Sequence, residues 1–360
     1  MEYSIPRCYA KKNGFQIWRH TFAGQNKVTG EMRSFFIELC LINPQLNPKS
    51  VVLGMSHQKD KKNRDMRPSY VLVKAGCFGK GAKQMHQFYP GDKLSVSRKR
   101  LEISVQDQLL TDTELRGSVS MSYSQAVAPE LMSDGGFMKW NLQMQKLIGT
   151  KISRRATKGP DKNRMYWQVP GCKTQYAGAV LFDGEEYTVF PHKSFGYTDV
   201  IWGKDFVNPW VMLNGSSLVS QITGKRLSQS CFDVGGFFGK EKNKRLAAIF
   251  HHEGNEYQFN ASGRTHKDNV KFDFTENGGI CHWTITAQNS KALVDIEVFC
   301  KTEEMILMNY ENPNGEKNFK RLLAGASGYG EIRLYKKIQK SLEIIEQARI
   351  ENAGCMYGKY

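Results

Sequence analysis

The sequence of 360 residues predicts an all-β protein of two antiparallel β-barrel or sandwich units with little helix. Segments rich in β-branched and aromatic residues recur along the chain between turn-forming residues, which is typical of strands. The chain has 33 glycines, and dipeptides such as Asp183-Gly184 provide the tight turns that join antiparallel strands. One turn-and-strand pattern occurs twice, which indicates two related units.

Strand-like segments follow one another through most of the chain. The clearest are 33–42, 69–76, 93–106, 114–123, 176–190, 245–260, 271–288 and 292–301. Residues 124–133 predict a short helical turn, and 336–354 predict a helix-like stretch, with a strand hairpin as the alternative. So many short strands favour an antiparallel architecture over alternating helices and strands.

The repeated pattern lies at 28–39 and 222–234. Each copy has a Thr-Gly turn followed by a strand in which an acid follows an aromatic residue, and these acids are Glu38 and Asp233. Since a repeated pattern of this kind marks related units, the two acids are predicted to occupy corresponding places.

A basic stretch containing glycine and proline, 151–164, lies between the two copies. We therefore predict one β unit over 1–160 and a second over 161–360. A Greek-key sandwich and a pair of calycin-like barrels both fit this pattern, and small barrels enclose space for one ligand.

The formal net charge of +16 comes largely from clusters of basic residues. These clusters lie at 59–67, 98–100, 151–164 and 240–245. They suit an anionic membrane surface, nucleic acid or simply solvated loops. Nucleic acid is the disfavoured partner, because none of the common binding modules occurs in the sequence.

The eight cysteines are scattered and form no C-x-x-C pair, which favours free thiols in a reducing compartment. The N-terminus lacks a signal-peptide pattern and no apolar run is long enough for a spanning helix, so a cytoplasmic location is expected. No metal site and no cofactor are predicted. Phosphate-loop, zinc-helix and nucleophile-elbow motifs are absent.

Residues 194–210, "SFGYTDVIWGKDFVNPW", combine acids with many aromatic rings. In an extended strand Tyr197 and Asp199 share one face, while Trp202 lies on the other unless a bulge brings it round. Phe195 and Trp210 flank this strand. His86 is a weaker candidate that lies among aromatic residues farther back in the chain.

Three segments resemble the tocopherol cyclase-like family, whose relatives include carotenoid hydratase and AttH-like lipocalin-type proteins. They are "RSFFIEL" (33–39), the block 176–203 that ends in Trp-Gly, and 204–236. The chain departs from the family pattern at Ile37 and Leu39, and at Val200-Ile201 before the Trp-Gly. These departures bear on the activity more than on the fold.

The resemblance implies two lipocalin-like units and an apolar pocket for a prenylated or isoprenoid substrate. It also implies protonation of an alkene, followed by cyclisation or hydration. Such chemistry needs an acid kept protonated by an apolar site, and aromatic faces to stabilise the cation. We therefore predict a hydrophobic small-molecule ligand, with the following residues in the site. The catalytic candidates are Asp199, Glu38 and Tyr197, and the substrate-binding candidates are Trp202, Trp210, Phe36, Phe195, Asp233 and His86.

The alternative is a carrier of the same fold without catalysis. A barrel can retain an isoprenoid through apolar burial alone, at about 0.8 kcal/mol per buried methylene. In that case Asp199 and Glu38 are structural.

Overall fold

The computed structural model describes residues 13–54, 59, 62–63, 66–97, 99–150, 165–206, 209–237, 245–260, 269–318, 322–339 and 341–358. The basic stretches 151–164 and 240–244, with parts of 59–67 and 98–100, lie outside these residues. The anionic-membrane contact predicted from them therefore stays a prediction. Within the described residues, no helix is long and apolar enough to cross a membrane.

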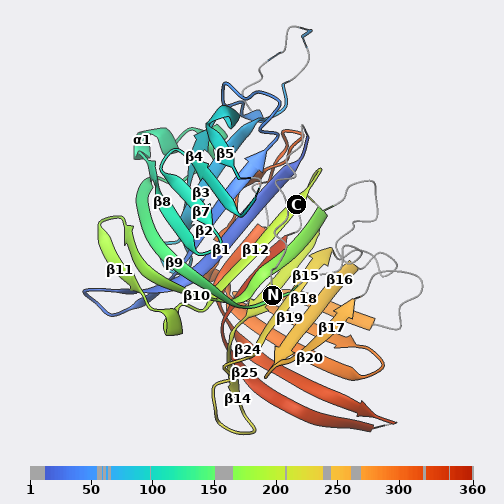
Figure 1. Cartoon of the computed structure of the whole chain (residues 1–360). Helices are drawn as coiled ribbons and strands as arrows, with labels where there is room; N and C mark the ends of the chain where they lie inside the picture. Colours follow the sequence, from blue (N-terminus) through green and yellow to red (C-terminus); the bar gives the residue numbers. More distant parts are fainter. Residues whose placement is uncertain are drawn as a thin grey trace.

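The first sheet is antiparallel and takes up the N-terminal part of the chain (Figure 1). Its strands are β1 (Phe15–Asn26), β2 (Met32–Ile42), β3 (Tyr70–Cys77), β4 (Lys83–Tyr89), β5 (Leu94–Val96), β6 (Glu102–Val105), β7 (Gln108–Thr111), β8 (Glu114–Met121), β9 (Gly136–Thr150), β10 (Met165–Phe182), β11 (Glu185–Val189) and β12 (Gly196–Gly203). They run in the order β4-β3-β2-β1-β11-β10-β9-β8-β7-β6-β5, and β12 pairs with both β1 and β10. The sheet curls enough to bring β4 beside β8.

The second sheet is built from the remainder of the chain, coloured yellow to red in Figure 1. Its strands are β13 (Trp210–Gly215), β14 (Ser217–Ser220), β15 (Cys231–Phe237), β16 (Arg245–His252), β17 (Asn255–Asn260), β18 (Asn269–Asn277), β19 (Ile280–Gln288), β20 (Ala292–Lys301), β21 (Ile306–Leu307), β24 (Leu322–Ile338) and β25 (Ser341–Gly358). β22 (Tyr310–Glu311) and β23 (Lys317–Asn318) form a separate pair. The edge strands β17 and β18 lie side by side, so this sheet also curls round.

Helical segments among the described residues are short. The α-helix α1 (Tyr123–Ala126) and the 3-10 turn Pro129–Leu131 lie where a helical turn was predicted. Further 3-10 turns are Gly91–Lys93, Pro191–Lys193 and Thr302–Glu304. The segment 336–354 forms the β24–β25 hairpin, the second of its two predicted alternatives.

The prediction of two lipocalin-like antiparallel β units with little helix is therefore confirmed. The sheets separate in sequence between Gly203 and Trp210, and the predicted domain boundary at residue 160 stays a prediction.

The repeated turn has the same local hydrogen bonds in both sheets. The Gly30 amide donates to the Asn26 carbonyl oxygen at 3.0 Å, as the Gly224 amide does to that of Ser220. In each turn the threonine amide donates to a side-chain oxygen four residues before the glycine, on Asn26 or Ser220. The meanders β1-β2-β3-β4 and β13-β15-β16-β17 are thus corresponding parts of two related units.

The buried apolar residues form three clusters: one inside each unit and one between the two sheets. The intersheet cluster includes Trp167 of β10 and Trp210 of β13, whose rings meet edge to face at 6.0 Å. Strand alternation explains this arrangement, since even-numbered residues of β1 such as Trp18 face the first unit's interior. Odd-numbered residues such as Ile17 face the second sheet.

We expect Gly235→Ala to destabilise the contact between the sheets. A Cβ atom at Gly235 would lie 2.4 Å from the Trp167 ring, and overpacking of this kind costs about 1–3 kcal/mol. Urea unfolding measures the loss. Trp167→Leu should recover part of it in the double variant, whereas strictly additive losses would contradict this packing.

We also expect His20 to make stability fall in acid. Burial, and then the charge of Lys146, lowers the pKa of His20 to about 3. In the unfolded chain His20 takes up a proton near pH 6.5, whereas in the folded chain it stays neutral until about pH 3. The stability that the neutral His20 contributes is therefore complete above pH 6.5 and is lost as the pH falls toward 3. At pH 4 the loss is at most about 3 kcal/mol. His20→Gln should lose less unfolding free energy between pH 7 and 4 than the native chain, and an equal loss would refute the assignment.

Candidate active site

A row of charged side chains crosses the face of the first sheet that is covered by the second. Cross-strand pairing places Asp199 of β12 opposite Arg19 of β1, Arg19 opposite Glu38 of β2, and Glu38 opposite Lys74 of β3. Negative and positive groups alternate along this row, and all four side chains are buried. We call these four residues the charged row.

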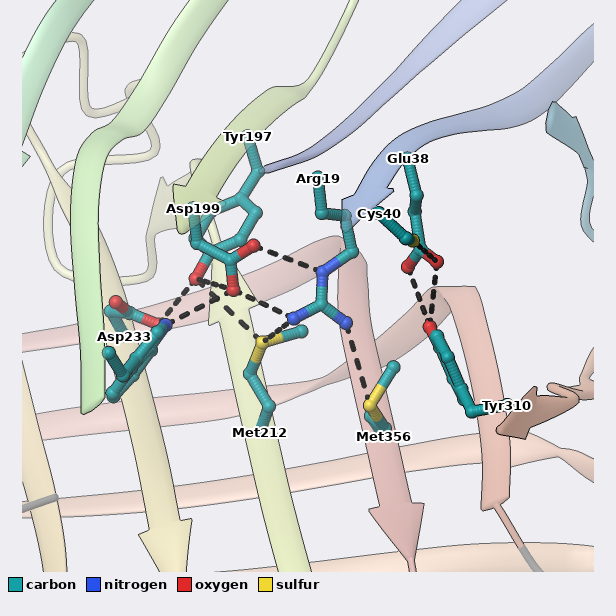
Figure 2. A network of polar contacts seen from close by, with 10 residues as sticks. Arg19, Glu38, Cys40, Tyr197, Asp199, Met212, Asp233, Tyr310 and Met356 are labelled. Atoms are coloured by element: carbon teal, nitrogen blue, oxygen red, sulfur yellow. Dashed lines mark hydrogen bonds and ion pairs between the residues drawn. The ribbon is translucent and has the colours of Figure 1, made fainter. Parts of the chain in front are cut away.

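The pair at one end of the row is bidentate (Figure 2). Arg19 Nε donates to Asp199 Oδ1 at 3.1 Å, and Arg19 Nη2 donates to Asp199 Oδ2 at 2.8 Å. Trp167 Nε1 donates to the same Oδ2 at 3.1 Å. Burial raises the pKa of the Asp199 carboxyl, while Arg19 and the Trp167 donor oppose that rise. Because all three bonds favour the carboxylate, Asp199 holds Arg19 in place as its counter-ion.

The other end of the row centres on Glu38. The Tyr310 hydroxyl lies 2.7 Å from Oε1 and 2.8 Å from Oε2, and Lys74 Nζ lies 3.5 Å from Oε2. Burial, and then the Glu38 charge, raises the pKa of Tyr310 well above its ordinary value, so the hydroxyl keeps its proton. Burial lowers the pKa of Lys74, against the raising effect of Glu38. Lys74 also donates to the Asn309 carbonyl oxygen at 2.8 Å.

The second sheet covers this row with polarizable and acidic groups. The thioether sulfurs of Met212 and Met356 lie 3.3 and 3.5 Å from Arg19 Nη2 and Nη1. The Tyr197 hydroxyl lies 3.4 Å from both Asp199 Oδ2 and Asp233 Oδ1. Burial, and then the charges of Asp199 and Cys231, raises the pKa of Asp233 well above its ordinary value. This direction of the pKa shift favours the neutral form of Asp233.

A small pocket with a cavity volume of about 30 Å³ lies next to the charged row. It is lined by Ile17, Arg19, Glu38, Met165, Ile201, Phe206, Trp210, Tyr310, Leu322 and Met356. Most of these residues are apolar, and the polar groups that reach the pocket are Arg19, Glu38 and Tyr310. Both sheets contribute to the lining, so the pocket exists only when the two units are packed together.

The predicted site residues divide into two groups. The structure brings Glu38, Asp199, Tyr197 and Asp233 together with Arg19 in one network, and Trp210 lines the pocket. Phe36 is buried in the intersheet cluster against Phe78, beside this network.

The other three lie elsewhere. Trp202 stacks on Tyr166 at 5.6 Å and packs against the first unit's own core, because β12 runs regularly to Gly203 and no bulge brings the ring round. Phe195 is half-buried in a turn with a φ of 45°. His86 lies in β4, with Nδ1 3.0 Å from the Leu131 carbonyl oxygen. None of these three residues lines the pocket.

Sequence reasoning missed Arg19, Lys74 and Tyr310. The first two carried a signal, because each is a single charge inside a strongly apolar strand segment, "FQIWRHTF" or "SYVLVKAGC". Buried charges are rare and need partners. Tyr310 carried no such signal, since it lies in the short β22 and meets Glu38 from 272 residues away.

Among the described residues, no group of three or more His, Cys, Asp or Glu side chains is arranged to hold a metal ion. The prediction that no cofactor is needed is not tested by this arrangement.

No protein-family model matches the chain, and a search of curated proteins gives no match. Solved structures with a similar arrangement include an AttH-like protein from Nitrosomonas europaea, with 10% identity, a TM-score of 0.45, and coverage of 96% of this chain and 93% of that one. CghA with Sch210972 has 9% identity, a TM-score of 0.47, and coverage of 97% and 89%. Kievitone hydratase from Nectria haematococca has 10% identity, a TM-score of 0.43, and coverage of 99% and 94%.

The AttH-like protein is one of the relatives named by the sequence resemblance, whereas the tocopherol cyclase-like family itself is not confirmed. All three TM-scores lie below 0.5, so we argue activity from the residues of this chain.

We expect Asp233→Asn and Asp199→Asn to change stability in opposite directions. An asparagine has the shape and the neutrality of a protonated Asp233. In the unfolded native chain, Asp233 ionises above its ordinary pKa of about 3.8, and this ionisation stabilises the unfolded state. The native fold therefore loses stability as the pH rises above that value, and Asp233→Asn avoids the loss. Asp199→Asn leaves Arg19 buried without its counter-ion, at a cost of about 3–5 kcal/mol.

Melting temperatures measured from pH 4 to pH 8 test both expectations. The advantage of Asp233→Asn over the native chain should grow with pH. An advantage that shrinks as the pH rises would show that Asp233 is ionised in the folded chain.

Proposed function

We propose that the protein is an enzyme that binds a prenylated, unsaturated small molecule in the intersheet pocket and protonates its alkene from Glu38. The observation that carries this proposal is the meeting of a buried, hydrogen-bonded carboxyl with an otherwise apolar pocket. Buried charged networks are often no more stabilising than apolar packing, so their presence beside a pocket favours a chemical role.

Glu38 suits the role of proton donor better than the other two acids. It lines the pocket, whereas Asp199 and Asp233 do not. Asp199 is committed to Arg19 through two hydrogen bonds. Asp233 reaches the network only through the Tyr197 hydroxyl. Asp199 and Tyr197 therefore act as positioning residues, and Asp233 as a neutral neighbour.

The proposed step starts from the protonated form of Glu38, whose carboxyl proton adds to one alkene carbon and leaves a tertiary cation on the other. Attack by the substrate's own phenol oxygen closes a ring, as in tocopherol cyclase-like chemistry, and attack by water gives a hydrate. In either case the oxygen then loses a proton to the Glu38 carboxylate, which restores the acid. Lys74 and the Tyr310 hydroxyl stabilise that carboxylate while it is ionised.

Aromatic rings in the pocket are placed to stabilise the cation. The ring centroids of Phe206 and Tyr310 lie 5.6 Å apart, and Trp210 lines the pocket with these two rings. Ring faces attract cations most strongly where water is excluded. Arg19 supplies a donor for the phenol oxygen of the substrate.

We expect Glu38→Gln to lower turnover of a short prenylated hydroquinone by about 100-fold or more, because an amide cannot give up the proton. Tyr310→Phe should lower it less, since it removes only the hydrogen bond to Glu38. Reaction in D2O with mass spectrometry shows deuterium at the former alkene carbon. Glu346→Gln is the matched control, because Glu346 is equally buried but bonds to Ser220 in the second unit.

A folded Glu38→Gln protein that binds the hydroquinone and retains full turnover would rule out Glu38 as the donor. Saturable binding without turnover by the native chain would instead favour an isoprenoid carrier, in which the apolar lining alone holds the ligand.

A further inference from the structure

A second groove lies on the outer face of the second sheet, away from the intersheet pocket. It is open to solvent, has a volume of about 520 Å³, and crosses β20, β24, β25 and the turn after β14. β14 pairs with β25, which brings these strands together on one side of the sheet (Figure 1). Register shifts in β24 at Gly325, Gly328 and Gly330 bend the sheet at this point.

Two aromatic rings, those of Phe299 and Tyr329, line the groove, and His282 lies beside Phe299 outside it. His282, Phe299 and Tyr329 are directly opposite one another on β19, β20 and β24. The His282 and Phe299 rings stack at 4.2 Å with an angle of 7°, and Phe299 and Tyr329 stack at 5.8 Å. Tyr329 is 46% exposed, so part of its ring is open to solvent.

Hydrogen-bonding side chains surround these rings. Glu297, Glu331, Glu351, Arg349, Gln221, Ser327 and Asn352 line the groove with Phe299 and Tyr329. Glu297 and Glu331 lie directly opposite each other, an arrangement that costs stability in a sheet. The Glu297 and Glu331 side chains lie on the outer face of the second sheet, so they take no part in packing the core of the second unit.

The carboxylates are already paired with nitrogen groups. Glu297 lies 2.9 Å from His282 Nε2, Arg333 donates to both oxygens of Glu331 at 2.8 and 3.0 Å, and Arg349 donates to Glu351 at 2.8 Å. These bonds fix the carboxylates and offset their charge. Arg226 also donates to Glu351 at 3.0 Å, and a carboxylate can accept about four hydrogen bonds.

We propose that this groove binds a neutral saccharide. The C–H groups on one face of a sugar ring carry a partial positive charge and pack on the negative face of an aromatic ring. Its hydroxyls donate to fixed carboxylates and accept from a guanidinium or an amide. An anionic ligand would meet three carboxylates, and a polyamine would have to displace the existing pairs.

Calorimetric titration with maltotriose, cellotriose and triacetylchitotriose tests the proposal, with spermidine and adenosine as competitors of other classes. We expect at least one trisaccharide to bind with a Kd in about the millimolar range or tighter. Tyr329→Ala should weaken binding at least tenfold, and Glu297→Gln, which keeps the side-chain shape, at least threefold. Tyr123→Ala removes an exposed ring outside the groove and should change nothing.

Failure of all three trisaccharides to bind would overturn the proposal, as would tighter binding of spermidine or adenosine. Binding that survives in folded Tyr329→Ala and Glu297→Gln proteins would also overturn it, because the sugar would then lie elsewhere. Circular dichroism of each variant establishes that it is folded. These outcomes are independent of the chemistry at Glu38, which lies in the other pocket.

Discussion

The charged row Asp199–Arg19–Glu38–Lys74 is the constraint on which the rest of the structure depends. Its members come from β12, β1, β2 and β3, and they meet only if all three strand pairs have the observed register. A slip of one residue in any strand would move its charge to the opposite face. The row also needs a cover that excludes water without leaving the charges unpaired. The second sheet provides that cover with methionine sulfurs, and the separate β22–β23 pair adds the Tyr310 hydroxyl.

The same arrangement explains why the two related units have different parts in the site. The first unit supplies fixed charge along one face of its sheet. The second supplies the polarizable sulfurs of Met212 and Met356 and the ring of Tyr310. Where the side chains of the two units do not fill the space between the sheets, the pocket remains, and Glu38 and Arg19 are among its polar lining residues. The fold therefore places a buried carboxyl and an apolar pocket at a single contact surface, and the proposed acid-catalysed reaction rests on that arrangement.

Much of this could be predicted from the sequence, for reasons that lie in strand geometry. Alternation within β12 places Tyr197, Asp199 and Ile201 on one face, and the structure has all three toward the second sheet. The repeated turn marks Glu38 and Asp233 as corresponding acids, and they flank one network. What the sequence could not provide was cross-strand register: Arg19 and Lys74 become partners of the acids only through pairing over long separations. Trp202 lies outside the pocket because β12 continues to Gly203 without a bulge, and residue types do not specify such backbone geometry.

The most direct test of the central claim compares the organic extracts of native and Glu38→Gln protein purified from the same host. If Glu38 is the proton donor, the variant should retain an unsaturated prenylated compound. Added native protein should convert that compound to its cyclic isomer or its hydrate, identified by retention time and mass. If both extracts contain the same compound and native protein leaves it unchanged, the pocket stores its ligand and the catalytic account is wrong.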